Sequence, residues 1–207
     1  AMSSSHSPRG DLVDPDNLLL HRANVRRLQG EAIRDAILTV SGRLDSKQFG
    51  PPIPVHLTDF MQGRGRPKGG PLDGAGRRSI YLAVRRNFLP SFFLAFDFPT
   101  PSTTNGARHV SNVPAQALAL MNSPFVVAEA KRWGAQVAKN NSRGTAERIS
   151  DLWQAAFARP PSPAEREKAS SFLEQQRHRL RANEQDPRSW AELCHVLFNV
   201  KEFVYLR

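Results

Sequence analysis

The sequence predicts a mainly α-helical domain that carries one small β-hairpin and a long glycine-rich loop. Helix starts recur in the second half of the chain, where a proline follows a capping residue at Pro124, Pro163 and Pro187. Apolar residues follow each of these starts at helical spacing. Only two short segments, 53–57 and 79–84, have the composition of strands.

The 207 residues are enough chain for one domain with a sizeable core. We expect residues 1–13, which are polar and include a cloning remnant, to form a disordered lead-in. Residues 14–207 are expected to fold as a single helical domain. One helical apolar pattern runs over 18–28 and a second over 32–40, which fits two helices or one helix pinched at Gly30.

The middle of the chain contains the predicted hairpin and loop. Prolines restrict the segment 53–57 to an edge strand, which would pair with 79–84. Residues 61–76 include six glycines and are expected to form a flexible basic loop between the two strands. Aromatic residues over 88–98 predict a short buried helix. From residue 114 the chain is expected to be helical almost to its end, where apolar residues dock into the core.

Several kinds of site are excluded by residue counts and spacing. The single cysteine, Cys194, excludes an internal disulfide, a four-cysteine zinc site and a haem-attachment motif, and we expect it to lie in the core. No two histidines have the spacing of a metal site, and neither a nucleophile elbow nor a phosphate-binding loop occurs. No apolar run is long enough to span a membrane. The sequence therefore predicts no catalytic residue, metal ligand or cofactor-binding residue in this chain.

The net charge of +10 is concentrated around the glycine-rich loop. Residues 61–90 hold seven basic side chains and one acidic side chain, which accounts for six of the ten excess charges. Within them Arg64-Gly65-Arg66-Pro67 resembles the AT-hook, whose arginines enter the A·T minor groove. Nucleic acid, an acidic polysaccharide such as a sulfated glycan, and plain solvent all stay open as what this region faces. The candidate anion-binding residues are Arg64, Arg66, Lys68, Arg77, Arg78, Arg85 and Arg86.

Asp97 is the acidic residue of most interest because phenylalanines precede and follow it. A carboxylate among aromatic side chains needs hydrogen bonds or a cation. Arg108 or an arginine upstream of Asp97 could supply that cation, and the pair would then be a structural salt bridge. The alternative is that Asp97 is the acid of a carbohydrate-processing hydrolase.

A series of short motifs, taken in order, resembles the planctomycete-specific C-terminal domain of unknown function. The motifs are spread over nearly the whole chain from Pro15, and their order makes the set specific. Five of their positions are candidates for a functional role: Asp35, Tyr81, Asp97, Arg108 and Asn122. The motifs occupy residues 14–17, 26–28, 31–38, 40–45, 77–81, 96–99, 113–118, 120–126, 156–161 and 199–205.

The resemblance implies an exported protein, located in the periplasm or at the cell surface, of which this chain is the last domain. It implies that haem c is bound only by a cytochrome-c-like domain upstream, and that the upstream domains are the partners of this one. An acidic polysaccharide is a further candidate partner, whereas an exported domain does not meet chromosomal DNA. The resemblance carries over no catalytic residue.

Three functions follow from these observations. The first is a non-catalytic structural or interaction module at the C-terminus of a multidomain cytochrome-c-like protein. The second is an anion-binding or nucleic-acid-binding module that uses the basic loop at 63–70. The third is part of a carbohydrate-processing hydrolase. The first predicts an exposed apolar patch that other domains would cover.

Overall fold

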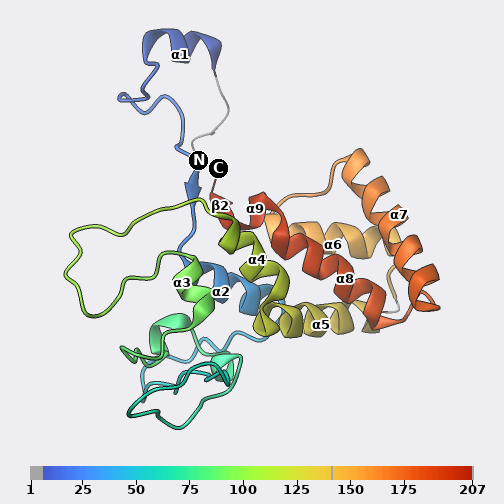
Figure 1. The fold of residues 1–207 in the computed structure, drawn as a ribbon. Coiled ribbons are helices and arrows are strands. Elements are labelled where there is room, and N and C mark those ends of the chain that lie inside the picture. Colours follow the sequence, from blue (N-terminus) through green and yellow to red (C-terminus); the bar gives the residue numbers. More distant parts are fainter. Residues whose placement is uncertain (1–6, 141, 207) are drawn as a thin grey trace.

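Helices α4 to α8 form the core of the protein in the computed structural model, which describes residues 7–140 and 142–206 (Figure 1). In the described chain their proline starts lie where the sequence predicts them, and the mainly helical fold is confirmed. Their bounds are α4 (Pro114–Asn122), α5 (Pro124–Lys139), α6 (Thr145–Phe157), α7 (Pro163–Leu180) and α8 (Pro187–Asn199).

The closest packing in the core is between α5 and α8. A side chain at Gly134 of α5 would place its Cβ 2.4 Å from the backbone nitrogen of Ala191, so only glycine allows the two helices to approach this far. Trp190 and Phe198 of α8 are completely buried, and the indole of Trp133 stacks on Phe198 with ring centroids 5.4 Å apart. Cys194 lies in this core, as expected.

Helix α2 (Gly30–Val40) packs on the core from the first half of the chain, together with the short helix α3 (Ser91–Ala95). Strand β1 (Arg26–Arg27) leads into α2 and pairs antiparallel with β2 (Tyr205–Leu206), which follows the short helix α9 (Lys201–Val204). The two ends of the domain therefore lie side by side (Figure 1). Phe203 and Val204 are buried, which confirms that the apolar end of the chain docks into the core.

The chain before β1 differs from the sequence-based expectation. Residues 8–13, expected to be a disordered lead-in, form the short helix α1 (Pro8–Val13), while residues 1–6 of that lead-in lie outside the described residues. The helix expected over 18–28 is wrong, because turns replace it. The carboxylate of Asp14 accepts the N–H groups of the residues that follow this turn, and Asn17 has a φ of 54°, which no α-helix contains.

The predicted hairpin is also wrong, although the two segments do meet. Ile53 donates its N–H to the carbonyl of Tyr81 and accepts the N–H of Ala83, both at 2.8 Å, in an isolated parallel bridge. The residues flanking Ile53 are prolines, which have no N–H group, so the pairing cannot extend. Residues 79–81 form the 3₁₀-helix η2 (Ser79–Tyr81) where a strand was expected.

The glycine-rich segment follows the prediction for most of its length. Residues 61–73 have no regular helix or strand, and the 3₁₀-helix η1 (Gly74–Gly76) closes the segment. Gly74 and Gly76 have φ values of 59° and 73°, which favour glycine because it has no Cβ. The loop therefore ends in a fixed turn that leads directly to Arg77.

Candidate functional site

Helix α2 holds the segment that follows the glycine-rich loop through two adjacent side chains. Asp35 accepts hydrogen bonds at Oδ1 from the N–H and the hydroxyl of Ser79, at 2.8 and 2.7 Å. Arg34 donates to the carbonyl of Arg77 at 3.0 Å and to that of Asp73 at 2.6 Å. Burial of the Arg34 guanidinium lowers its pKa, although the nearby carboxylates oppose this. Asp35 thus joins two parts of the chain that are far apart in sequence.

Arg77 and Tyr81 form a second contact of this segment. The side chain of Arg77 is 8% exposed, and its guanidinium lies over the ring of Tyr81 at 4.2 Å from the centroid. Its Nη2 donates to the carbonyl of Phe49 at 2.8 Å, while the N–H of Phe49 donates to the hydroxyl of Tyr81 at 2.9 Å. Arg77, a candidate anion-binding residue, is therefore buried in the fold.

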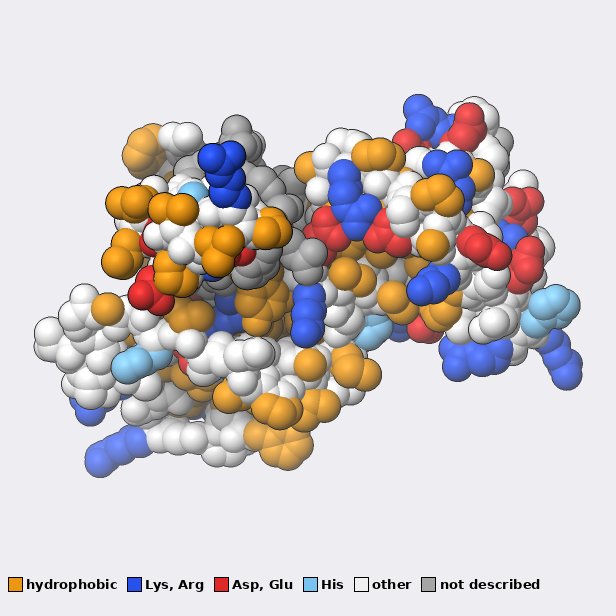
Figure 2. All heavy atoms as spheres, turned by 90° about the horizontal axis from the view of Figure 1, so that it is seen from above, with side chains coloured by type: hydrophobic (Ala, Val, Ile, Leu, Met, Phe, Trp, Pro, Cys, Tyr) orange, Lys and Arg blue, Asp and Glu red, His pale blue; other side chains and the backbone are white. Residues whose placement is uncertain are grey.

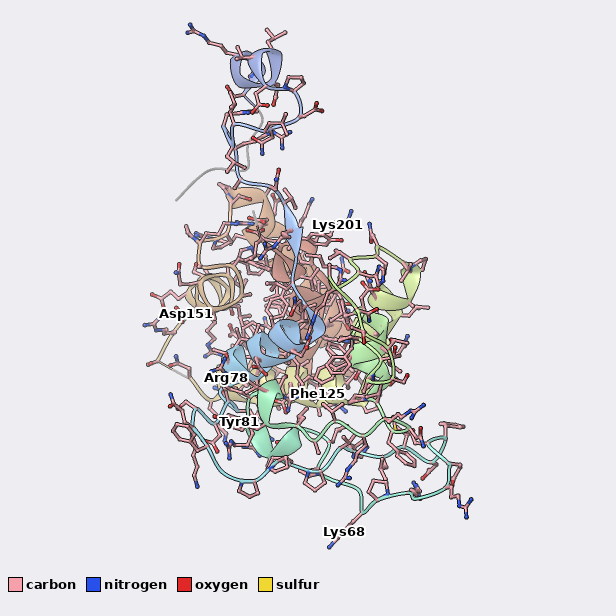
Figure 3. All side chains as sticks on the ribbon, turned by 90° about the vertical axis from the view of Figure 1, so that its left-hand side faces the viewer. Lys68, Arg78, Tyr81, Phe125, Asp151 and Lys201 are labelled. Carbon is pink, nitrogen blue, oxygen red and sulfur yellow. The ribbon has the colours of Figure 1, made fainter. Side chains whose placement is uncertain are left out.

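The other candidate anion-binding residues are exposed. Arg66 contacts the carbonyl of Thr58 at 3.3 Å, and Arg78 lies 3.8 Å from the carboxylate of Asp35. Lys68 points outward from the far edge of the loop, away from Arg78 (Figure 3). Among the described residues no carboxylate pairs with the three basic side chains of the loop or with the pair after η2. These unpaired cations are Arg64, Arg66, Lys68, Arg85 and Arg86.

Asp97 has a saturated hydrogen-bond environment. Arg27 donates to Oδ2 at 2.5 Å, and Ser111 donates its N–H and its hydroxyl to the two oxygens, each at 2.8 Å. Burial raises the pKa of Asp97, but the two hydrogen bonds from Ser111 and the charges of Arg27 and His109 outweigh it, so the net pKa is lowered. Asp97 therefore stays ionised, and its cation is the upstream Arg27.

Arg108 pairs with a different carboxylate. Its Nη1 donates to Glu31 at 2.8 Å and to the side-chain oxygen of Gln29 at 2.9 Å. Asn122 is the last residue of α4 and donates to the carbonyl of Leu118 within the same helix at 3.1 Å. Both side chains are exposed, and neither is a hydrogen-bond partner of Asp97, although the Arg108 guanidinium lies 5.8 Å from the ring centroid of Phe98.

Some of the candidate residues line a cleft between α2, η2 and the segment that follows η2. It has a volume of about 480 Å³, a base formed by Phe93 and Phe98, and a charged rim of Asp35, Arg78 and Arg108. Asp97 and Tyr81 do not line it. The described carboxylates at its rim already accept hydrogen bonds from Ser79 and Arg108, so the cleft lacks a free acid–base pair.

The N-terminal segment, residues 8–25, is a feature that the sequence reasoning missed. Its interior is polar, because Asp14 and Asn17 are 7% and 4% exposed. The ring of His21 lies between two carboxylates, with Nε2 3.0 Å from Asp11 and Nδ1 3.4 Å from Asp14. Asn17 also donates to the carbonyl of Arg22 at 2.9 Å. Hydrogen bonds thus fix the shape of this segment.

The surface of the N-terminal segment is apolar. Five large side chains are between 59% and 86% exposed, and Figure 2 shows hydrophobic side chains gathered over this part of the molecule. The segment stands away from the helical body (Figure 1). These residues, named here the leucine face, are Leu12, Val13, Leu18, Leu19 and Leu20. The turn residues Asp14-Pro15-Asp16-Asn17 directly before three leucines were the signal that could have identified it.

Metal-ligand clusters and membrane-spanning helices are both absent from the described residues. The described chain has no group of three or more His, Cys, Asp or Glu side chains placed to hold a metal ion. No described helix combines the length and apolar character that crossing a membrane needs. Burial raises the pKa of Cys194 well above its usual value, so its thiol is protonated and a poor nucleophile.

The chain is similar to a known protein family over most of its length. A family model described as PSD1, a protein of unknown function (DUF1553), matches residues 1–173. Neither the curated proteins nor the solved structures include a match to this chain.

Proposed function

The chain belongs to the PSD1 family of proteins of unknown function (DUF1553), the planctomycete-specific domain family, and on that premise we propose that it is a non-catalytic interaction module. Its partner is the preceding part of the same polypeptide, in a larger protein exported to the periplasm or the cell surface. The observation that carries this proposal is the leucine face, which an ordered segment presents to solvent.

Exposed leucines in an ordered segment favour association. Burying one leucine side chain stabilises a complex by about 1.5 to 3 kcal/mol. Residues 12–20 hold five large apolar side chains and bury none of them, whereas the polar Asp14 and Asn17 of the same segment are buried. This is the reverse of the usual distribution in a soluble segment, and it supports a surface that another domain covers.

The segment is also prepared for binding before it meets a partner. Asp14 accepts the N–H groups of Leu18 and Leu19, both at 2.8 Å, and this fixes the backbone that carries the leucines. A surface that is ordered in the free protein loses less conformational entropy on binding than a flexible one. The pKa of Asp14 is lowered, because hydrogen bonds and the nearby His21 outweigh its burial, so these contacts persist at neutral pH.

The location of the leucine face fits a partner in the same polypeptide. A domain that precedes this one would enter the fold next to α1, directly beside the exposed leucines. Linkage raises the effective concentration of such a domain to the millimolar range, so a modest apolar surface is sufficient. In this proposal haem chemistry belongs to the preceding domains, and this chain supports and orients them.

Calorimetric titration of this chain with the preceding portion of its polypeptide tests the proposal. Leu18→Ser combined with Leu19→Ser should weaken binding at least tenfold, because both side chains lose their apolar contact with the partner. The matched control is Val110→Ser combined with Leu118→Ser, two residues that are 66% and 56% exposed elsewhere on the surface. Binding that is absent, or that the leucine variant leaves unchanged, would overturn the proposal.

A further inference from the structure

Residues of the α5–α6 connection and of the turn from α7 to α8 line a polar cavity. These two segments lie at one end of the helical bundle (Figure 1). Its volume is about 540 Å³. It lies away from the N-terminal segment and from the cleft beside α2. The residues that line it are Ser142, Arg143, Gly144, Arg148, Asn183, Glu184 and Gln185.

Arg148 brings an incompletely bonded cation to this cavity. The residue is 6% exposed, and its guanidinium lies 5.6 Å from the centroid of the Trp190 ring. Nε donates to the carbonyl of Arg143 at 2.8 Å, but the buried Nη1 has no hydrogen-bond partner in the described structure. A guanidinium N–H that is removed from water and left without an acceptor is unfavourable. A ligand atom that accepts a hydrogen bond from this nitrogen would therefore stabilise it.

Arg177 of α7 does not line this cavity but approaches the same ring from the adjoining pocket. Its guanidinium carbon is 5.9 Å from the centroid of Trp190, and its Nε and Nη2 are buried without a hydrogen-bond partner in the described structure. The nearest carboxylate oxygen, on Glu184, is 3.9 Å from Nη2 and thus beyond hydrogen-bond distance. Two arginines therefore bring three unsatisfied donor nitrogens to the neighbourhood of Trp190.

Glu184 shows that this neighbourhood stabilises negative charge. Its carboxylate accepts a hydrogen bond from the hydroxyl of Thr145, the first residue of α6. That hydrogen bond lowers the pKa of Glu184, and the charges of Arg177 and Arg148 add to it despite partial burial. The first turn of a helix also carries backbone N–H groups without intrahelical acceptors and the positive end of the helix dipole.

The geometry points to a binding site for a tetrahedral oxyanion, sulfate or phosphate, held by Arg148 and the first turn of α6, with Arg177 adding positive charge from the adjoining pocket. The carboxylate of Glu184 competes with a bound anion for the positive charge of the arginines at this site. The two oxygens of its carboxylate leave the Nη1 of Arg148 and the Nε and Nη2 of Arg177 unbonded. An anion with four oxygens directed to different sides can accept from the guanidinium of Arg148, which lines the cavity, and from the helix N–H groups together.

Titration calorimetry of the full chain with sodium sulfate and with sodium phosphate tests this site, with sodium chloride at equal ionic strength as the reference. Heat of binding is the readout, because sulfate raises the thermal stability of most proteins through exclusion from their surface. A phosphorylated or sulfated monosaccharide, used in parallel, distinguishes a site for the free ion from a site for an ester group on a larger molecule. Tighter binding of the ester identifies the larger molecule as the source.

Two substitutions make the test specific. Arg148→Lys keeps the charge but loses the planar fork, and we expect anion affinity to fall at least tenfold. Glu184→Gln keeps the hydrogen-bonding shape but removes the competing charge, and affinity should rise severalfold. Arg166→Lys, an exposed arginine of α7 outside the cavity, is the matched control and should leave affinity unchanged.

If Arg148→Lys fails to fold, the rise in anion affinity expected for Glu184→Gln still tests the site. The site is refuted if neither anion produces heat with the parent protein and Glu184→Gln. It is also refuted if Glu184→Gln binds no more tightly than the parent, or if a folded Arg148→Lys variant binds as tightly.

Discussion

Single carboxylates in this protein join parts of the chain that are far apart in sequence. Asp97 binds Arg27 and Ser111, while Asp35 binds Ser79. Each of these carboxylates accepts a hydrogen bond from at least one backbone N–H. Water can take the place of the carboxylate in such a bond only if this part of the fold opens. Such residues explain how a chain with long irregular segments keeps them in place against the helices.

Asp97→Asn should lower the free energy of unfolding by about 3 kcal/mol, because it leaves the buried cation of Arg27 without its counter-charge. Urea unfolding at neutral pH measures this loss. Asp16→Asn, at an exposed aspartate, is the control and should change stability by less than about 0.5 kcal/mol. A loss equal to that of the control would show that Asp97 and Arg27 contribute no net stability.

The lowered pKa of Asp97 makes the stability of the parent protein depend on pH differently from that of Asp97→Asn. A carboxyl whose pKa is lower in the folded than in the unfolded state stabilises the fold above its unfolded value, near 3.8. That stability disappears as the pH falls through the folded pKa. The parent protein should therefore lose more stability between pH 5 and pH 2 than Asp97→Asn, measured by urea unfolding at each pH.

Among the helices, the approach of α5 to α8 depends on a residue without a side chain. Glycine in a helix interior usually lowers stability by about 1 kcal/mol relative to alanine. At position 134 close packing reverses that preference, because a Cβ atom would lie 2.4 and 2.6 Å from the backbone nitrogen and Cα of Ala191. Backbone atoms cannot move aside as a flexible side chain could.

Gly134→Ala should destabilise the protein by about 2 to 3 kcal/mol, since the two central helices must separate to admit the methyl group. Thermal unfolding followed by circular dichroism measures the change. Gly106→Ala is the control, because nothing lies within 4 Å of the position that its Cβ would occupy. An increase in stability for Gly134→Ala would mean that helix propensity outweighs packing here.

The helices were predictable because their starts are local. Proline at the first helical position acts through adjacent atoms in α5, α7 and α8, and in α7 and α8 the preceding residue also caps the helix with its side chain. These helices therefore begin where the sequence places them. The hairpin was not predictable, because the parallel approach of Ile53 to Leu82 depends on how the intervening loop returns to α2. Local composition identifies such a contact but does not fix its direction.

Several residues of the candidate sites could not be judged from the sequence, because their surroundings come from distant parts of the chain. Arg77 was predicted to be an anion-binding residue on the strength of its charge, yet it is buried against Tyr81 through contacts with a distant loop. The sequence pattern predicts that Leu18 and Leu19 belong to a helical stripe, although the turn before them leaves both side chains exposed to solvent. Arg148 gave no functional signal, because its surroundings come from the α5–α6 connection, the turn between α7 and α8, and Trp190 of α8.

For the whole molecule, the N-terminal segment and the helical body have separate roles. Helix α1 buries none of its residues, and the core consists of residues from Ile33 onward. The segment therefore contributes little to the stability of the fold. Its hydrogen bonds hold its own shape, which the proposed docking requires.

Removal of residues 1–24 should leave thermal unfolding cooperative and the free energy of unfolding within about 1 kcal/mol of the parent, because no core side chain is lost. The same truncation should abolish binding of the preceding domains. Differential scanning calorimetry and titration calorimetry measure the two effects. A truncated protein that no longer unfolds cooperatively would show that the segment is part of the folding unit.

The pairing of β1 with β2 also decides how the domain responds to force. Arg26 pairs with Leu206 and Arg27 with Tyr205, so a pull applied experimentally to both ends of the domain acts at one end of the sheet. Tension applied there opens the hydrogen bonds one after another, as a zipper opens, and never loads them all together. In such a pull the helical core carries load only after this short sheet has opened.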